Sequence, residues 1–323
     1  MSIKLNDVAK RAGVSVTTVS RVINHKGYLS ATTISKVETA MQELHYRPNA
    51  AARSLQGKSL KLIGLVFPNI HNIFYAELIE AIEQNLYVRG YRALLATTEH
   101  DADKERDSLS MLLSNQVDGI IYGSHNLTPD DYERIDAPVI AFDRLLTPDT
   151  AIVSSDNYQG GLLATETLIR TGAKNIAIFT GSDNTNSPTR LRHAGYAQTM
   201  ESHGLIPHIL QFSPNLTEIR KQAEIKKALQ DRKFDAIFCT DDLTALLVKN
   251  VAKELAIKIP EDLHLIGFDG THFIQTYQPD LTTIQQPISD LASLLVDLLL
   301  KKISGEEIDL SYLLPVKISL GNL

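Results

Sequence analysis

One stretch near the N-terminus decides the fold of that end of the chain: residues 5–24 read LNDVAKRAGVSVTTVSRVIN. Val8 lies on the apolar side of a first short helix, and Gly13 permits a sharp turn that a side chain would obstruct. Ser15 is placed to cap a second helix, and Val19 faces back onto the first one. The spacing predicts a helix-turn-helix, with an ordinary helical hairpin as the alternative.

The second of these helices leaves a face free for DNA. The early positions of a recognition helix meet base edges in the major groove. There Val16 can touch a thymine methyl, Thr17 can hydrogen-bond a base, and Arg21 can donate two bonds to guanine. We therefore expect DNA contacts from Ser15, Val16, Thr17, Thr18, Ser20 and Arg21.

Charge is distributed unevenly along the chain. Residues 1–60 carry nine Lys/Arg and three Asp/Glu, a net charge of +6, whereas the remaining residues carry 23 basic and 35 acidic side chains, a net charge of −12. A basic head on an acidic body is the asymmetry expected when one end of a protein meets phosphates. A chance cluster of charges on a solvated surface is the alternative.

The segment that follows the helix-turn-helix is short and poised between two states. Residues 46–58 read YRPNAAARSLQGK. Pro48 and Asn49 can start a helix, but a helix of one or two turns is too short to be stable alone. Such a segment could fold when pressed against DNA and a partner copy, with Leu55 wedged into a minor-groove step. A plain linker is the alternative.

From residue 62 onward, short β-rich runs alternate with helical stretches. Strands are predicted over residues 62–67, 93–97, 119–122, 139–142, 175–180, 209–212, 236–240 and 263–268. Such alternation indicates parallel sheets covered by helices on both faces. The expected fold is an all-α helix-turn-helix head followed by an α/β core of two doubly wound parallel-sheet subdomains, with a cleft between them.

Polar residues follow three of these strands. Asp143, Asp241 and Asp269 each come directly after an apolar run. In parallel sheets, ligands bind outside the carboxyl ends of the strands, so three carboxylates at such ends favour a ligand-binding edge. Since Asp after a strand is also a common helix cap or turn residue, a purely structural role is the alternative for each of them.

Two motifs are shared with a known family. Residues 7–24 and 46–49 carry them, and through them the chain resembles the LacI/GalR family of bacterial repressors over essentially its whole length. Within the family, residues 52–58, 72–77 and 186–195 are most similar to repressors of sucrose operons in Gram-positive bacteria.

The resemblance implies a core like that of periplasmic binding proteins, and a homodimer on a near-palindromic operator with a hinge helix in the minor groove. It adds the DNA contacts Asn24, Asn49, Ala52, Arg53 and Leu55. It divides the chain into a DNA-binding domain (1–46), a hinge helix and linker (47–59) and an effector-binding and dimerisation core (60–323). The core splits into subdomains of about 60–158 and 159–323, with crossovers near 288 and 315.

The resemblance also implies an effector site between the subdomains. Its positions are Asn72, Phe74, Tyr75, Asp143, Arg192, Asp241, Asp269 and Gln286. Asp241 stands where many relatives have Asn, and Ile288 stands where some have an aromatic residue. Carboxylates accept from sugar hydroxyls and the Arg192 fork donates several bonds, so a sugar or a sugar phosphate fits. Candidate phosphate partners are Arg144, Arg190 and His193, with surface solvation as the alternative.

These features predict an allosteric repressor of a sugar-utilisation operon, with sucrose the favoured sugar and effector binding expected to release DNA. A regulator of another carbohydrate operon, a global catabolite regulator, and a sugar-binding protein without a DNA role are the alternatives. The sequence contains no phosphate loop, no H-E-x-x-H or G-x-S-x-G motif and no metal-ligand spacing of its histidines, so we expect neither an enzyme nor a metal site.

Location and assembly are also predicted. The sequence shows no signal peptide and no apolar run long enough to span a membrane, and its single Cys239 cannot form an internal disulfide. A cytoplasmic protein without membrane contact is therefore expected. No heptad run precedes Leu323, so we expect a dimer and no tetramer.

Overall fold

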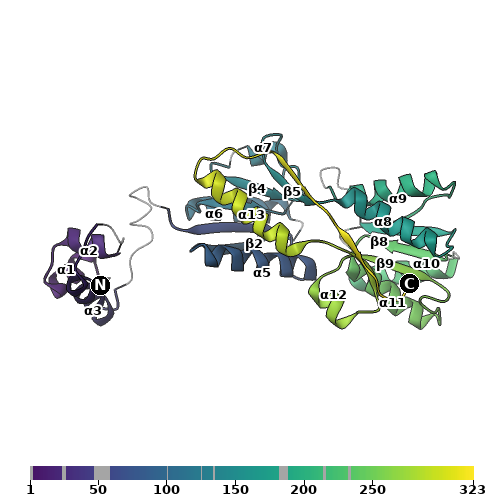
Figure 1. Ribbon diagram of the computed structural model, residues 1–323, viewed down its shortest axis with the longest axis horizontal. Coiled ribbons are helices and arrows are strands. Elements are labelled where there is room, and N and C mark those ends of the chain that lie inside the picture. The colour runs from purple at the N-terminus through teal and green to yellow at the C-terminus, as the bar shows by residue number, and fades with distance from the viewer. Residues whose placement is uncertain are drawn as a thin grey trace. The chain divides into compact units, whose positions relative to one another are not determined.

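The computed structural model describes residues 3–23, 27–46, 59–99, 101–124, 126–133, 135–181, 188–213, 216–231 and 234–323. The chain divides into two compact units, residues 1–60 and 61–323, whose elements are labelled in Figure 1. Five predicted DNA contacts lie outside the described residues, namely Asn24, Asn49, Ala52, Arg53 and Leu55, as does nearly all of the predicted hinge.

Three helices build the described part of the first unit: α1 (Leu5–Ala12), α2 (Val16–Ile23) and α3 (Ala31–Glu43). They enclose a small apolar core in which Val8 and Val19 are fully buried. Gly13 ends α1 in the left-handed conformation, with φ at 65°. The Ser15 hydroxyl accepts a 3.1 Å hydrogen bond from the Thr18 N–H at the start of α2. The predicted helix-turn-helix is therefore confirmed.

The second unit contains two six-stranded sheets, and the first has the order β11-β5-β4-β3-β1-β2 with all strands parallel. Its strands are β1 (Leu62–Phe67), β2 (Arg92–Thr97), β3 (Gly119–Tyr122), β4 (Val139–Phe142), β5 (Ile152–Ser155) and β11 (Ser311–Leu314). It carries the helices α5 (Ile73–Val88), α6 (Ala102–Ser114), α7 (Pro129–Tyr132) and α13 (Ile288–Ile303). We call this sheet with these helices the first lobe.

The alternation of side chains along β1 shows how the first lobe is layered. Leu65 and Phe67 pack into the apolar cluster that contains α5 and α13, whereas Val66 between them packs against Leu112 of α6. Successive side chains of a strand point to opposite faces of a sheet, so the helices cover both faces. This is why the β1 sequence is a continuous apolar run.

The second sheet has the order β12-β10-β9-β8-β6-β7, with β12 antiparallel to β10 and the other pairs parallel. Its strands are β6 (Ile176–Gly181), β7 (His208–Phe212), β8 (Ala236–Cys239), β9 (His264–Asp269), β10 (Thr282–Gln285) and β12 (Lys317–Ser319). It carries α8 (Asn157–Arg170), α9 (Arg190–Ser202), α10 (Glu218–Asp231), α11 (Asp242–Glu254) and α12 (His272–Tyr277). We call this sheet with these helices the second lobe.

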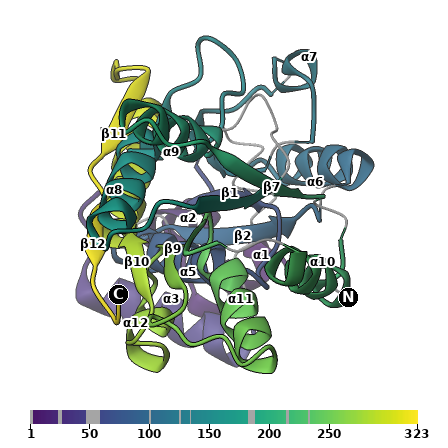
Figure 2. The same ribbon diagram turned by 90° about the vertical axis from the view of Figure 1, so that its right-hand side faces the viewer.

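Helices cover both faces of the second sheet. The helices α8 and α9 pack into one apolar cluster, and α10 and α11 pack into the other; Figure 2 shows the two pairs on opposite sides of the strands. The predicted α/β core of two subdomains, each a largely parallel sheet with helices on both faces, is therefore confirmed. None of the helices that the structure describes is long and apolar enough to cross a membrane.

The two lobes are joined by three chain crossings within the described residues. The chain leaves β5 for α8, returns from β10 to α13, and leaves β11 for β12. Figure 1 shows α13, coloured yellow-green, among the blue elements of the first lobe, although it follows them by more than a hundred residues in the sequence. Three adjacent crossings allow the lobes to change their mutual angle without unfolding either sheet.

Candidate functional site

The structure places the described part of the predicted DNA-reading set on α2 or at its start. Val16, Thr17 and Arg21 are exposed, and Ser20 is half-buried. Val16 keeps 41% of its surface exposed although it is apolar. The Arg21 guanidinium lies against Gly27, where an added Cβ would be 2.3 Å from Nη2. One helix face therefore offers a small apolar group, a hydroxyl and a guanidinium together, which are groups that read base edges.

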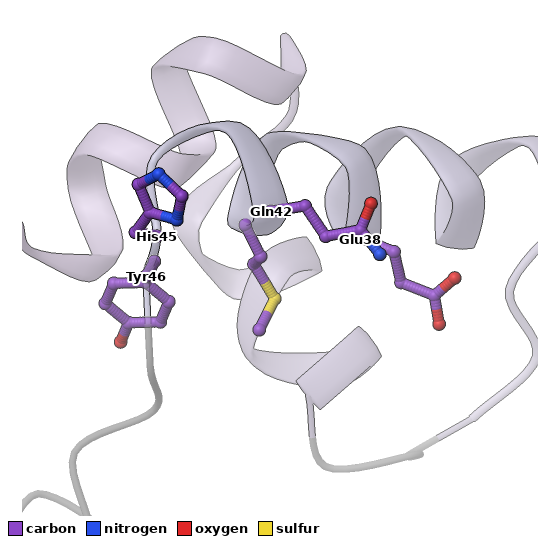
Figure 3. A pocket seen from close by; sticks show the side chains of 5 residues that line it. Glu38, Gln42, His45 and Tyr46 are labelled. Atoms are coloured by element: carbon purple, nitrogen blue, oxygen red, sulfur yellow. The ribbon is translucent and has the colours of Figure 1, made fainter.

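A separate pocket in the head lies near the end of α3. It is lined by Glu38, Met41, Gln42, His45 and Tyr46. Figure 3 shows Glu38 and Gln42 on α3, with His45 and Tyr46 just beyond the end of this helix. None of the lining residues belongs to the DNA-reading set on α2. This pocket is therefore distinct from the candidate DNA interface.

In the second unit, a buried arginine is the centre of a polar network between the lobes. Arg192, on α9, is only 6% exposed. Its Nε donates to the Asn157 side-chain oxygen at 2.7 Å, and its Nη1 donates to the Thr240 carbonyl at 2.6 Å. Nη1 also lies 3.8 Å from Oδ1 of Asp269, and the guanidinium carbon lies 3.6 Å from the centroid of the Phe268 ring.

The network closes on itself and reaches both lobes. Asp269 Oδ1 accepts a 2.8 Å bond from the Gln286 amide, whose oxygen accepts a 2.7 Å bond from the Ser155 hydroxyl. Asn157 donates through Nδ2 to the Ser155 carbonyl and to Asp143 Oδ1, both at 3.0 Å. Because Asp143 and Ser155 belong to the first lobe, a change in the bonds of this network alters contacts in both lobes.

Two glycines bring α8 and α9 close enough for this network to form. A Cβ on Gly161 would lie 2.2 Å from the Arg192 carbonyl oxygen, and a Cβ on Gly195 would lie 2.3 Å from the carbonyl oxygen of Tyr158. These distances leave no room for a side chain, so the two helix backbones touch. This contact places Arg192 beside Asn157, the first residue of α8.

Three buried carboxyl groups surround the network. Burial raises the pKa of Asp143, and the nearby Arg192 and Arg144 oppose that shift. Burial raises the pKa of Asp269 well above its usual range, with Arg192 opposing and Asp242 adding to the shift. Burial also raises the pKa of Asp242 to about 7. A raised pKa extends the pH range over which a carboxyl group is protonated, and a protonated carboxyl group can donate as well as accept hydrogen bonds.

Other predicted site residues have local structural partners. Asn72 caps α5 by accepting a 2.9 Å bond from the Phe74 N–H, and Phe74 itself is buried in the apolar core of the first lobe. Both carboxylate oxygens of Asp241 accept bonds from Thr244, at 2.7 and 2.6 Å. Asp241 therefore acts as a helix cap, which is the structural role that the sequence left open for it.

Tyr75 connects the predicted residues of the two lobes. Burial raises the pKa of its hydroxyl, and the charges acting on that hydroxyl are those of Arg144, Asp143, Asp269 and Arg192. The first lobe supplies two of these groups and the second lobe supplies the other two. The structure thus brings together Tyr75, Asp143, Arg192, Asp269 and Gln286, whereas Asn72, Phe74 and Asp241 have the local roles given above.

Sequence reasoning missed several members of the network. Asn157, Ser155, Thr240 and Asp242 were not among the predicted site residues. Asp242 accepts bonds from the Gly270 N–H at 2.7 Å and from the Thr283 hydroxyl at 2.6 Å. The sequence contained a usable signal for two of them. Ser155 and Asn157 flank Asp156 at the end of β5, and polar residues also follow β4, β8 and β9.

The arrangement suits binding of a polyhydroxylated molecule. It combines carboxyl groups, an amide and a planar guanidinium in one network of residues from both lobes, and such groups fix the orientation of sugars. Across the described residues, no group of three or more His, Cys, Asp or Glu side chains is arranged to hold a metal ion.

Comparison with known families matches both units. Residues 4–49 match the model of bacterial regulatory proteins of the lacI family, and residues 165–320 match a periplasmic binding protein-like domain. The chain is 66% identical to the sucrose operon repressor of Lactococcus lactis subsp. lactis, over 99% of both chains.

Solved structures give the same picture. The lac repressor dimer bound to operator and the anti-inducer ONPF has a TM-score of 0.86 and 27% identity, covering 99% of this chain and 98% of its own. A periplasmic binding protein/LacI transcriptional regulator from Alkaliphilus metalliredigens, complexed with D-xylulofuranose, has a TM-score of 0.74 and 33% identity. It covers 80% of this chain and 97% of its own.

Proposed function

The chain belongs to the lacI family of bacterial regulatory proteins, and on that premise we propose that it represses a sucrose-utilisation operon. It is a regulator and not an enzyme. The observation that carries the proposal is the 66% identity, over essentially the whole of both chains, to a sucrose operon repressor. Such identity extends through the head and the core together, so it supports the same pairing of DNA binding with ligand control.

The head supplies DNA binding in this proposal. Val16, Thr17 and Arg21 on α2 enter the major groove, where they read base edges. Two copies of the chain bind a near-palindromic operator, as the lac repressor dimer is bound to its operator. Residues 47–59 act as the hinge between head and core.

The core supplies ligand control. We place the effector, a sugar or a sugar derivative, against Arg192, Asp269 and Asp143, and two further hydrogen-bonding groups come from Gln286 and Tyr75. A relative of known structure is complexed with D-xylulofuranose, which supports a sugar as the ligand class. Several of the polar atoms already bond to one another, so a sugar would exchange these internal bonds for bonds to its hydroxyl groups.

The coupling follows from the position of the network between the lobes. A ligand that bonds to Asp143 in the first lobe and Asp269 in the second favours one angle between them. If binding of two heads to the operator requires a different angle between the lobes, the ligand lowers the affinity of the protein for the operator. The coupling is reciprocal, so operator must lower effector affinity by the same factor.

Fluorescence anisotropy with the full-length protein tests this proposal. The DNA is a labelled duplex of the region upstream of a sucrose-utilisation operon, and a shuffled duplex of the same composition is the control. We expect tighter binding to the operator duplex and its release when the sugar is added. Equal affinity for both duplexes contradicts the repressor assignment, whereas operator binding that no sugar alters contradicts the ligand control.

A further inference from the structure

One buried charge next to the network has no partner. Arg144 directly follows Asp143 at the carboxyl end of β4, and its side chain is only 7% exposed. Its Nη1 is shielded from solvent and has no hydrogen-bond partner among the described residues. An unsatisfied donor on a buried charged group is costly, so native structures pair such groups or reserve them for a ligand.

Ionisable groups lie near Arg144 without taking up its N–H groups. Its electrostatic neighbours are Tyr75, Asp143, Tyr132 and Glu105. Within the described part of the chain, none of the four forms an ion pair or hydrogen bond with it. Asp143 instead accepts a bond from Asn157. The guanidinium is therefore held in place by its surroundings while its donors stay uncommitted.

Glu105 is prevented from pairing with Arg144 by its own hydrogen bonds. It is fully buried on α6. It accepts five hydrogen bonds, from the hydroxyls of Tyr122, Ser124 and Tyr132 and from the backbone and side-chain nitrogens of Asn126. With both oxygens occupied, the carboxylate supplies long-range compensation for Arg144 and no direct contact.

Arg144 shares its surroundings with the proposed effector site. The hydroxyl of Tyr75 is under the influence of Arg144 and Asp143 from the first lobe and of Asp269 and Arg192 from the second. Arg144 and Arg192 therefore both lie within electrostatic range of the Tyr75 hydroxyl. Asp143, the neighbour of Arg144 in the chain, accepts a hydrogen bond from Asn157, which itself accepts one from Arg192.

Arg144 differs in burial and in hydrogen bonding from the other cationic groups that could bind a phosphate. Arg190, at the start of α9, is exposed. His193 is half-buried and already has an interaction partner. Arg192 spends Nε and Nη1 on Asn157 and Thr240. Arg144 is thus the buried cation whose donors remain available.

We propose that Arg144 is an anion subsite and that the effector is therefore a phosphorylated sugar, whose phosphoryl oxygens accept from this guanidinium. This inference rests on the proposed function, because it specifies the chemistry of the ligand at that same site. A planar guanidinium matches a phosphoryl group through two parallel charge-assisted bonds. A hydroxyl group offers one uncharged acceptor oxygen, so it satisfies the several donors of Arg144 less well.

The nearby carboxyl groups are compatible with an anionic ligand. Burial raises the pKa of Asp143 and of Asp269, which favours their protonated forms and lessens the repulsion that two carboxylates would exert on a phosphate. In that state, each can donate a hydrogen bond to the ligand. The site then presents two arginines and two buried acids with raised pKa values to a group with several acceptor oxygens.

Calorimetric titration of the full chain with sucrose, sucrose 6-phosphate and inorganic phosphate tests the inference at pH 7 and constant ionic strength. We expect wild type to bind the phosphorylated sugar at least tenfold more tightly than sucrose. In R144Q this preference should fall to near unity, and R144K, which keeps the charge but loses the fork, should lie between the two. R190Q removes an exposed arginine and should keep the wild-type preference.

The results distinguish failure of the anion subsite from failure of sugar control. Equal or tighter binding of sucrose by wild type, or an R144Q variant that keeps the phosphate preference, overturns the anion subsite while sugar control stands. Loss of the preference in R190Q moves the subsite to α9 and also overturns it. If neither sugar binds wild type, the sugar-effector part of the proposed function fails, and the inference fails with it.

Thermal melting without ligand distinguishes a reserved ligand group from a structural one. Because Arg144 is buried with unused donors, R144Q should keep or raise the Tm of the core. A clear drop in Tm for R144Q, with R144K near wild type, would show that the charge supports the fold and would overturn its assignment as a ligand group.

Discussion

The carboxylate Oε2 of Glu77 accepts a 2.9 Å hydrogen bond from the backbone N–H of His272. Glu77 lies on α5 of the first lobe, and His272 is the first residue of α12 in the second lobe. The bond therefore ties the two lobes together at a point separate from the polar network around Arg192. Its strength contributes to the preference for the lobe arrangement seen in the structure.

Removing this bond should destabilise the core slightly. We expect Glu77→Ala to lower the free energy of unfolding by about 1 kcal/mol, the usual net value of one hydrogen bond. Glu77→Gln retains a side-chain oxygen and should lose less. Urea unfolding followed by circular dichroism measures both, with Glu80→Ala, at an exposed site on the same helix, as the control. An unchanged Glu77→Ala variant would mean that the bond does not hold the lobes together.

Asp242 should make the stability of the core depend on pH. Burial raises its folded-state pKa to about 7, whereas an unfolded Asp loses its proton near pH 4. Between these values the folded state holds the extra proton, so the contribution is complete below about pH 4 and is lost as pH rises towards 7. The free energy of unfolding should fall by up to about 1.4 kcal/mol per pH unit from this group.

Asp242→Asn removes the titrating group and tests that sign. Urea unfolding at several pH values between 4.5 and 7.5 should show a shallower fall in stability for this variant than for wild type. Asp107→Asn, which changes an exposed carboxylate on α6, should keep the wild-type slope. Identical slopes for wild type and Asp242→Asn would place Asp242 in its ionised form throughout this range.

The sequence predicts the buried strands well because their composition is decisive. The predicted ranges 62–67, 119–122 and 139–142 coincide with β1, β3 and β4, whose apolar residues are covered by helices on both faces. β5 and β10 were not predicted, because Ile152–Ser155 and Thr282–Gln285 are short and at least half of their residues are polar. Their strand conformation comes from pairing with neighbours in the sheet, which a local pattern does not contain.

The local sequence pattern predicted members of the candidate site only where polar residues end recognised strands, whereas Tyr75, Arg192 and Gln286 were predicted from the family resemblance. Asp143 and Asp269 follow β4 or close β9, and both join the network. Asn157 was missed because its partner Arg192 is 35 positions away, and their contact depends on the close approach of α8 and α9. Asp241 shows the opposite case. It also follows a strand and was predicted for the site, but its side chain caps α11.

Arg192 should be required for effector binding. Its guanidinium is fixed by Asn157, Thr240 and the Phe268 ring, so a ligand meets a group that is already oriented. Loss of hydrogen bonds from a charged donor costs about 2–3 kcal/mol, and we therefore expect Arg192→Ala to weaken effector binding by about 100-fold.

Operator binding provides the control for Arg192→Ala. The variant should bind operator DNA like wild type, because the head forms a compact unit of its own, but added effector should no longer release the DNA. Arg192→Lys keeps the charge without the planar fork and should recover part of the response. A normal shift of operator affinity by effector in Arg192→Ala would remove this arginine from the binding site.

Arg21 should contribute to sequence preference as well as to affinity. It is exposed on α2, the helix that carries the predicted base-reading residues. A guanidinium that donates two bonds to one guanine discriminates at that base pair, so Arg21→Ala should cost about 1–3 kcal/mol of operator binding and relax the preference at one position in each half-site.

Arg11→Ala provides a matched control, since it removes the same charge from the same unit. Arg11 lies on α1 and pairs with Glu43 at 2.6 Å, away from the exposed face of α2. Its loss should weaken binding to all duplexes by a similar small factor, through the electrostatic term alone. Anisotropy titrations with operator variants changed at single base pairs compare the two substitutions. If Arg21→Ala weakens all duplexes uniformly, as Arg11→Ala does, Arg21 contacts the phosphate backbone and does not read a base.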